Sequence, residues 1–506
     1  MGLVARWIAV VALSASFASA QNSGEQRTSR YMESIRQQPA LLLAFLRGMP
    51  KGGDLHNHLA GAVYAESLID YAAENGMCVD RTSSYVIPPP CDSSCERFTS
   101  KPLASCAYRD HVLYNSLIDA WSMRNFKTEE ESGHDHFFAT FDKFFPALIN
   151  HNGDGIAEVA ARAAEDHVQY LELMHTADGN TAAQLGAKIG WNDDLARFRQ
   201  KLLDGGMAEI EAQTRAQLNL DEMRMRSVLR CGAKNEDAGC GVKVRYLYQV
   251  LRGLPKEQVF AQMVLGFELA KSDPRFVGLN LVMPEDWYTP MHDFDLHMKM
   301  LDYLHGVDPG VHVSLHAGEL AMGLVPPEGL RFHIRESIAR GHAERIGHGV
   351  DVMHESDAIP LLKEMAQRKV LVEICLTSND VILGVRGKEH PLTVYRQYGV
   401  PVALATDDEG VSRIDLTHEY VRAVETYGLS YTDLKEMARE SLEHSFLPGL
   451  GLWSSMKPSK PVAACAVSWT SASCKKFLDG SERARVQWKL EEEFAEFEKS
   501  VARGPS

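Results

Sequence analysis

The sequence is poor in the features that mark nucleic-acid-binding, membrane-spanning and repeat proteins. Its 506 residues include 68 acidic and 53 basic side chains, for a net charge of -15. Without an excess of basic residues, nucleic acid and anionic membrane surfaces are poor candidates for the main partner. After residue 20 there is no apolar run of transmembrane length and no internal repeat. We therefore expect a globular protein that binds a small uncharged molecule and has no stable membrane association.

The only long apolar run lies at the start of the chain and has the pattern of a secretory signal peptide. Arg6 supplies the positive end, apolar residues extend from Trp7 to Phe17, and Ala18-Ser19-Ala20 is typical of a cleavage site. A membrane anchor is the alternative, but the run is shorter than the ~20 residues of a spanning helix. We predict cleavage before Gln21 and export to the periplasm or outside the cell.

The nine cysteines include no Cys-x-x-Cys pair. They form three local groups of even number and one single residue, namely Cys78, Cys91, Cys95 and Cys106; Cys231 and Cys240; Cys465 and Cys474; and Cys375. A zinc site in the first group is the alternative, but without ligand-spaced pairs we predict disulfides formed in an oxidising compartment. The spacing leaves the pairing within the first group open. The single cysteine follows an apolar strand pattern and is predicted to be a buried free thiol.

Short apolar runs alternate with longer segments of helical spacing, which predicts an α/β protein with a parallel sheet. The predicted strands are a segment around His56, 168–173, 242–250, 276–282, 311–316, 345–348, 370–375 and 401–406. Eight strands with helical connections predict a (β/α)8 TIM-type barrel. We expect a signal peptide at 1–20, an N-terminal helical extension at 21–49, the barrel at 50–447 with a cysteine-containing insertion at 77–110, and a C-terminal helical tail at 448–506.

Polar residues gather at the ends of four predicted strands, which in such a barrel form the catalytic rim. They are His56 and His58, His316 and Glu319, His348, and Asp407 with Asp408. Each alone has a structural explanation, but their joint placement indicates an active site. Three imidazoles and one carboxylate suit zinc or another divalent transition metal, which leaves a carboxylic acid and a histidine for proton transfer.

Chance alone would give about one His-x-His motif in a chain with this many histidines. The sequence indeed has a second, His134-Asp135-His136, in a polar stretch before an aromatic helical run. We predict that this second pair lies in a loop, as a solvated or packing element. In contrast, His56 and His58 share one face of a strand, because strand side chains alternate with period two.

With these landmarks, the chain resembles the adenosine deaminase family. The motifs that carry the resemblance are Pro50 to Leu59 (PKGGDLHNHL), Ser314 to Glu319 (SLHAGE), Ile346 to Gly349 (IGHG), Ser378-Asn379 and Thr406-Asp407-Asp408, in this order. The leader, the cysteine insertion and the N-terminal extension are most similar to its secreted, growth-factor-related branch. The likeness spans roughly residues 50 to 447.

The resemblance implies one zinc ion bound by His56, His58, His316 and Asp407. It implies that Glu319 protonates purine N1, that His348 handles the activated water, and that Asp408 accepts a hydrogen bond at the N7 edge. The implied reaction is hydrolysis of adenosine or 2′-deoxyadenosine at C6 to inosine or 2′-deoxyinosine and ammonia. A purine nucleoside would be the partner, and a homodimer is left open.

Two departures bear on substrate binding. Ala60 stands where relatives have a polar residue that helps to hold the ribose. Met283 stands where relatives have a glycine that lets the backbone approach purine N3. These changes leave open a modified adenine nucleoside or another aminopurine as substrate. The site residues are also compatible with a metal-dependent amidohydrolase for a different cyclic amidine or amide, and with a secreted nucleoside-binding or growth-factor-like protein whose site is vestigial.

Overall fold

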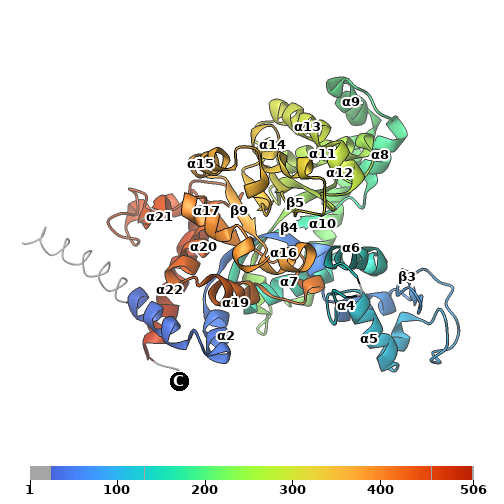
Figure 1. Cartoon of the computed structure of the whole chain (residues 1–506), viewed down its shortest axis with the longest axis horizontal. Coiled ribbons are helices and arrows are strands. Elements are labelled where there is room, and N and C mark those ends of the chain that lie inside the picture. Colours follow the sequence, from blue (N-terminus) through green and yellow to red (C-terminus); the bar gives the residue numbers. More distant parts are fainter. Residues whose placement is uncertain (1–23, 130, 457–458, 504–506) are drawn as a thin grey trace, which may run out of the picture.

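A closed barrel of eight parallel strands forms the centre of the protein (Figure 1). The computed structural model describes residues 24–129, 131–456 and 459–503. The predicted signal peptide and its cleavage site lie outside these residues. The barrel strands are β1 (Gly52–His58), β4 (Val168–His175), β5 (Lys243–Leu251), β6 (Phe276–Val282), β7 (Ser314–Ala317), β8 (Arg345–His348), β9 (Leu371–Ile374) and β10 (Val402–Leu404). All eight predicted strands are present, and the predicted barrel is confirmed.

Two four-stranded sheets close on each other to make the barrel. Their strand orders are β1-β4-β5-β6 and β10-β9-β8-β7, and every pairing within them is parallel. Single parallel bridges, Leu279 to Val313 and Asn57 to Asp407, join the sheets at their two seams. Because all strands run the same way, their carboxyl ends meet at one rim, where the predicted site residues lie.

Helices cover the outside of the barrel. They include α7 (Asn152–Glu165), α11 (Lys256–Ser272), α13 (Phe294–Val307), α14 (His333–Ala339), α15 (Ala358–Arg368), α17 (Leu392–Tyr398), α19 (Leu416–Tyr427) and α20 (Tyr431–Glu443). Since one face of each strand meets helices and the other meets the barrel interior, β4 and β6 are buried at every position. Because both faces of these strands are buried, their sequences are nearly continuous apolar runs.

The cysteine-containing insertion forms a lobe beside the barrel, seen in Figure 1 around β3 and α5. It contains the short strands β2 (Cys78–Val79) and β3 (Val86–Ile87) and packs with α4 (Ala65–Glu74), α5 (His111–Ala120) and α6 (Gly133–Phe144) around a hydrophobic cluster of its own. Disulfides join Cys78 to Cys91 and Cys95 to Cys106, a pairing that the sequence left open.

The second His-x-His motif is not in a loop, and that prediction was wrong. His134 and His136 lie in the first turn of α6, whose N-cap is Ser132. The ring of His134 is buried, and its Nε2 lies 3.0 Å from a carboxylate oxygen of Asp286. A serine cap ahead of an aromatic helical pattern is the local signal that extends the helix back over the histidines.

The two ends of the described chain pack together against the barrel. Residues 24–35 and α2 (Pro39–Gly48) form helices that lie beside α22 (Glu482–Arg503) in Figure 1. The Phe45 ring contacts the rings of Tyr431 in α20 and Phe497 in α22. Lys435 forms a buried ion pair with Glu498. The predicted domain boundaries near residues 49 and 447 stay predictions.

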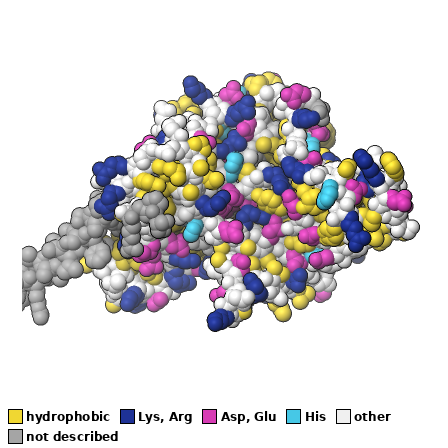
Figure 2. All heavy atoms as spheres, turned by 90° about the horizontal axis from the view of Figure 1, so that it is seen from below, with side chains coloured by type: hydrophobic (Ala, Val, Ile, Leu, Met, Phe, Trp, Pro, Cys, Tyr) yellow, Lys and Arg dark blue, Asp and Glu magenta, His cyan; other side chains and the backbone are white. Residues whose placement is uncertain are grey.

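The remaining cysteine predictions are confirmed. Cys231 pairs with Cys240, Cys465 pairs with Cys474, and Cys375 is a buried free thiol. Within the described ranges, no helix has both the length and the apolar character needed to cross a membrane. Figure 2 shows acidic and basic side chains interspersed on one face, which therefore carries no continuous basic stripe for nucleic acid.

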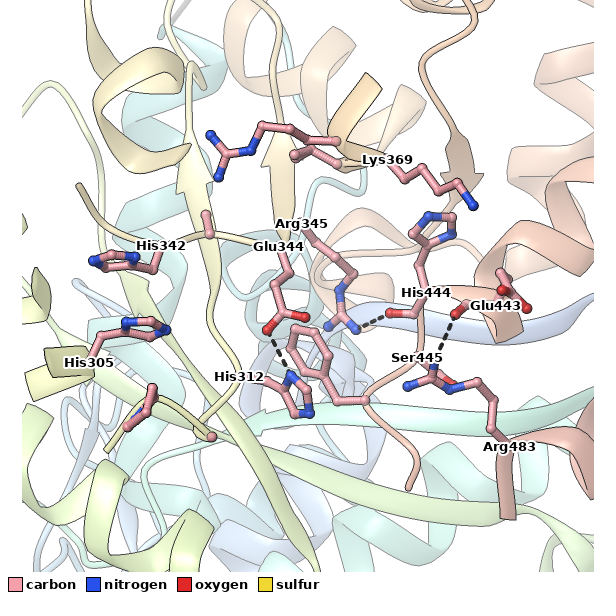
Figure 3. A pocket seen from close by; sticks show the side chains of 16 residues that line it. His305, His312, His342, Glu344, Arg345, Lys369, Glu443, His444, Ser445 and Arg483 are labelled. Carbon is pink, nitrogen blue, oxygen red and sulfur yellow. Dashed lines mark hydrogen bonds and ion pairs between the residues drawn. The ribbon is translucent and has the colours of Figure 1, made fainter. Parts of the chain in front are cut away.

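A cavity of about 570 Å³ lies at the end of the barrel opposite the predicted site (Figure 3). Its lining includes His312, just before β7, and Arg345, the first residue of β8, so it marks the amino ends of the strands. The Arg345 guanidinium is already paired with Glu373 and Glu172. In barrels of this type the amino-end face serves stability.

Candidate active site

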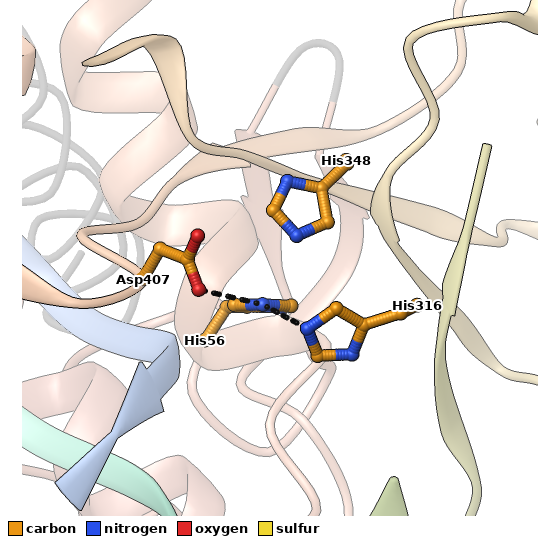
Figure 4. A group of neighbouring side chains, drawn as sticks. All are labelled: His56, His316, His348 and Asp407. Atoms are coloured by element: carbon orange, nitrogen blue, oxygen red, sulfur yellow. Dashed lines mark hydrogen bonds and ion pairs between the residues drawn. The ribbon is translucent and has the colours of Figure 1, made fainter. Parts of the chain in front are cut away.

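The predicted metal ligands come from three strand ends and meet at the carboxyl rim. Figure 4 shows three of them, His56, His316 and Asp407, together with His348. His56 and His58 point inward from the end of β1, His316 lies on β7, and Asp407 follows β10. The His56 Nε2 lies 3.1 Å from the His316 Nε2, and the His58 Nε2 lies 3.2 Å from it. One oxygen of Asp407 lies 3.4 Å from the His56 Nε2 and 3.2 Å from the His58 Nε2.

These distances fit a bound zinc ion. Ligand atoms about 2.0–2.2 Å from a tetrahedral zinc lie about 3.3–3.5 Å from each other, close to the separations seen here. Three imidazole nitrogens and a carboxylate oxygen are also the donor types that zinc prefers. The residues present therefore fit the metal that the family resemblance implies.

The opposite nitrogen of each ligand histidine is held by an oxygen atom. The Nδ1 atoms of His56, His58 and His316 lie 2.6, 3.1 and 2.8 Å from Glu373, Gln249 and Asn280, respectively. When Nδ1–H donates to an oxygen, the lone pair of a neutral imidazole is on Nε2 and faces the centre. Ser378 donates to the other oxygen of Asp407 at 2.6 Å, which orients that carboxylate.

Glu373 ties the ligand His56 to the interior of the barrel. Its other oxygen accepts from Arg345 Nε at 2.6 Å and from Ser314 at 3.0 Å. Arg345 in turn donates to Glu172 on β4 at 2.5 Å. All of these side chains are fully buried, and the two carboxylates share the single positive charge of the arginine. Burial alone would raise the pKa of Glu373, but Arg345 and His56 hold it below its usual value.

His348 also borders the cluster, but its hydrogen bonds assign it a role other than metal ligand. The Leu392 N–H donates to His390 Nδ1, so His390 Nε2 donates to the Asn379 carbonyl at 3.0 Å. The Asn379 amide nitrogen then donates to His348 Nδ1 at 2.9 Å. Neutral His348 therefore carries its proton on Nε2, where a metal ligand needs a lone pair. Burial lowers the pKa of His348 to about 3, which keeps the ring neutral.

Glu319 lies beside this ring with the properties of a proton donor. Its Oε1 is 3.6 Å from the His348 Nε2, and its backbone N–H donates to Glu285 at 2.8 Å. Burial, followed by the nearby carboxylates of Asp407 and Glu285, raises the pKa of Glu319 well above its usual value. A carboxylic acid that stays protonated near neutral pH is suited to general-acid catalysis.

Asp408 is buried next to the cluster, and its Oδ1 has no hydrogen-bonding partner in the described structure. The carboxyl lies against Gly61: a Cβ at that position would be 1.8 Å from Oδ1. Burial raises the pKa of Asp408 well above its usual value. A glycine is therefore required opposite this carboxyl. One Asp408 oxygen lies within 4.8 Å of the facing atoms of His58 and Asp407, so the carboxyl borders the cluster.

Met283 follows β6 with a φ of +85°, a conformation that side chains other than glycine rarely adopt. The methionine sulfur and methyl group lie against Gly253, because a Cβ there would come within 3.0 Å of both. The backbone carbonyl accepts a hydrogen bond from Arg252 at 3.1 Å. A positive φ is the conformation that glycine adopts most easily, so it fits the glycine that the family resemblance implies at this point. The role of Met283 in substrate binding stays a prediction.

The sequence analysis missed the residues that orient the ligands. Gln249, Asn280 and Glu373 each interrupt an apolar strand pattern near its carboxyl end, and that interruption was the available signal. Gly61 and Gly347 gave no such signal: at Gly347 a Cβ would lie 2.5 Å from the His56 ring.

Comparison with known proteins decides the family. A model of the adenosine deaminase family matches residues 110–450. This chain belongs to the adenosine deaminase family. The matched segment contains His316, Glu319, His348, Asp407 and Asp408, whereas the β1 ligands precede it and rest on the geometry. Membership of the growth-factor-related branch stays a prediction.

Curated relatives align over a shorter stretch. Adenosine deaminases of Escherichia coli strain SE11 and of Salmonella heidelberg are 36% and 38% identical over 141 residues, which are 28% of this chain and 39% of each relative. The chain thus matches about two fifths of the length of these relatives. Among solved structures, an Arabidopsis N6-mAMP deaminase is 20% identical over 80% of this chain and 96% of its own, with a TM-score of 0.51. At that identity the likeness supports the barrel fold.

Proposed function

We propose that this protein hydrolyses adenosine and 2′-deoxyadenosine to inosine and 2′-deoxyinosine with release of ammonia. The observation that carries the proposal is the convergence of three imidazoles and the Asp407 carboxylate near Glu319, a carboxyl whose pKa burial raises. Family membership supports deamination of a purine nucleoside or nucleotide. His56, His58, His316 and Asp407 would hold one zinc ion. A zinc ion bound there acidifies water and so makes a nucleophile available near neutral pH.

Glu319 would donate its proton to purine N1. Protonation withdraws electrons from C6, which is otherwise a poor electrophile, and so favours attack there. His348 would donate a hydrogen bond from Nε2 to the attacking oxygen, because Asn379 occupies its Nδ1. The C6 amino group then takes up a proton that the attacking water has lost and leaves as ammonia, so that one water is consumed for each ammonia released.

Asp408 would bind the purine at N7. Adenine N7 is itself an acceptor, so the hydrogen bond would run from a protonated Asp408 to N7, the reverse of the direction that the resemblance implied. The raised pKa of Asp408 supports this direction. A metal centre alone does not need this second carboxyl, so its presence favours a purine over other cyclic amidines.

The test is ammonia release by purified zinc-loaded protein from a panel of aminopurine bases and nucleosides. We expect turnover of adenosine and 2′-deoxyadenosine with inosine or 2′-deoxyinosine as product. Tight nucleoside binding without ammonia release would favour a nucleoside-binding protein. Turnover of only non-purine amidines or amides would favour an amidohydrolase of different specificity.

We also propose that the protein is exported. The four disulfides support an oxidising destination. The N-terminal sequence of protein recovered from the periplasm or medium would test this, with Gln21 expected as the first residue.

A further inference from the structure

A pocket of about 750 Å³ adjoins the metal cluster on the side of β1, β4 and β5. Its near wall contains Leu59 and Ala60, which directly follow the ligand His58. Gln249, which accepts from the Nδ1 of His58, lines the same wall. The far wall is the helix α10 (Ala208–Val228), through Gln213, Thr214 and Gln217. A substrate whose base lies at the metal therefore has this pocket beside it.

The pocket has both apolar and polar lining residues but offers nothing to balance a negative charge. No lysine or arginine of the described chain lines it, and its charged lining residues are Asp142 and Asp178. Amide side chains come from several segments, namely Asn150, Asn152, Asn180, Gln213, Gln217 and Gln249. Amides with a few carboxylates donate and accept hydrogen bonds, as hydroxyl groups require.

Two buried atoms in this wall lack hydrogen-bonding partners in the described structure. They are Nε2 of His175, a residue with an exposed fraction of 9%, and Oδ1 of Asn180. Burial lowers the pKa of His175 to about 4, so the ring is neutral near pH 7. Both atoms are sealed from solvent and so do not face the open pocket, which leaves the amide side chains as the main hydrogen-bonding groups of its wall.

The pocket is also larger than a ribose requires. Pockets of about 300–1,000 Å³ enclose whole drug-sized ligands. Here the purine would lie at the metal cluster, so 750 Å³ would remain for the sugar side of the substrate. Ala60 contributes only a methyl group to the wall that is nearest the metal cluster.

We propose that this pocket is a subsite for an uncharged, hydroxyl-bearing extension of the substrate's sugar, and that it excludes phosphorylated nucleosides. This inference rests on the proposed deaminase function. A phosphate placed here would lose its hydration beside Asp142 and Asp178 without a cation in the wall, which is unfavourable. A second sugar would instead find the amide side chains that several segments contribute to the wall.

The experiment compares three ligands: adenosine, adenosine with a second ribose on its 5′ oxygen, and adenosine 5′-monophosphate. Steady-state kinetics gives kcat/KM, and calorimetry of the zinc-loaded Glu319→Gln variant, whose turnover is slowed, gives Kd. We expect the disaccharide nucleoside to stay within about tenfold of adenosine, and the monophosphate to be at least about a hundredfold poorer by both measures.

A charge introduced at the far wall tests the location of the subsite. Gln217→Lys should raise the monophosphate-to-adenosine ratio of kcat/KM by about tenfold or more, because it supplies the missing cation. Ala216→Lys is the matched control, since this exposed residue is on the same helix but does not line the pocket. It adds the same charge, and its ratio should match that of the wild type.

Three results would overturn the inference: a monophosphate as good as adenosine, a disaccharide nucleoside reduced by about a hundredfold or more, or an equal effect of the two lysine variants. Absence of ammonia release from every ligand would instead overturn the proposed function. The relative Kd values of the three ligands, and their change in the lysine variants, would then test the inference without any measurement of turnover.

Discussion

At the scale of single residues, hydrogen bonds distinguish the groups that would hold the metal from the groups that would move protons. The three ligand histidines donate from Nδ1 to an oxygen, whereas His348 accepts at Nδ1 from Asn379. The same side-chain type thus has a lone pair on Nε2 in one setting and a proton there in the other. Hydrogen-bonding partners, not residue type, assign the roles.

Glu319→Gln should lower kcat by about a hundredfold or more while zinc content and substrate Kd change little. The amide keeps the shape and can donate a hydrogen bond to N1, but it cannot deliver a proton. Steady-state kinetics with metal analysis checks this. A variant with near-normal kcat, or one without zinc, would show that Glu319 is not the general acid.

The two His-x-His motifs should respond differently to substitution. His58→Ala should lose zinc, and His136→Ala should retain both zinc and activity.

Glu373→Gln should weaken zinc binding by about 10- to 100-fold. The carboxylate accepts from His56 Nδ1 and pairs with Arg345, so its loss reduces the basicity of the ligand and leaves a buried arginine short of one partner. Competition with a chelator measures the affinity. Glu364→Gln, at an exposed helix position, is the control and should bind zinc as the wild type does.

At the scale of elements, the position of a side chain in the site depends on how closely a neighbouring helix approaches it. In α3 (Leu59–Ala62), Gly61 lies against the Asp408 carboxyl. Gly61→Ala should push Asp408 out of place and lower kcat/KM by about tenfold or more, with zinc retained. Gly306→Ala, in α13 with nothing within 4 Å of the added methyl group, should leave the kinetics unchanged. Equal kinetics for the two variants would show that Asp408 does not bind substrate.

The start of α14 should make stability depend on pH. Glu355 accepts from the backbone N–H groups of Ile334 and Arg335, and burial raises its pKa to about 7. A carboxyl with a raised folded-state pKa stabilises the fold fully below its unfolded pKa of about 4.3 and loses that contribution as pH rises through about 7.

Glu355→Gln removes this proton while keeping an acceptor for the two N–H groups. The free energy of unfolding of the wild type, relative to that of the variant, should therefore fall between pH 5 and 8 by up to about 3 kcal/mol. Denaturant titrations across this range measure it. A pH-independent difference would contradict the prediction, and Glu364→Gln should show such a constant difference.

At the scale of the whole molecule, the metal cluster spans a seam of the barrel. Its ligands come from β1 in one sheet and from β7 and the end of β10 in the other, and these sheets otherwise meet through single bridges. Removal of zinc should lower Tm, and restoring zinc at about 100 times its Kd should add about 2.7 kcal/mol to the free energy of unfolding. His58→Ala should show no such gain. A Tm that is independent of zinc would contradict a site that bridges the two sheets.

The sequence by itself determined the barrel and the strand ends at which the proposed site residues lie. Most of the strands left an apolar run, β1 left the alternation of His56 and His58 around Asn57, and His316, His348 and Asp407 lie at or just after the carboxyl ends of their strands. The parallel order of the strands then brings those ends to one rim. The local sequence pattern was sufficient to predict the strands, because the burial of a strand and the polar residues at its end are both visible in a short segment.

Only the tertiary structure decided what surrounds these residues. Glu373 reaches His56 across 317 positions of the chain, and Arg345 reaches Glu172 across 173. The pairing of the first four cysteines, the fit of Gly61 against Asp408 and the uncharged pocket wall likewise depend on segments far apart in sequence. Such contacts leave no periodic signal, because a hydrogen bond or a steric limit between distant segments exists only once the chain has folded.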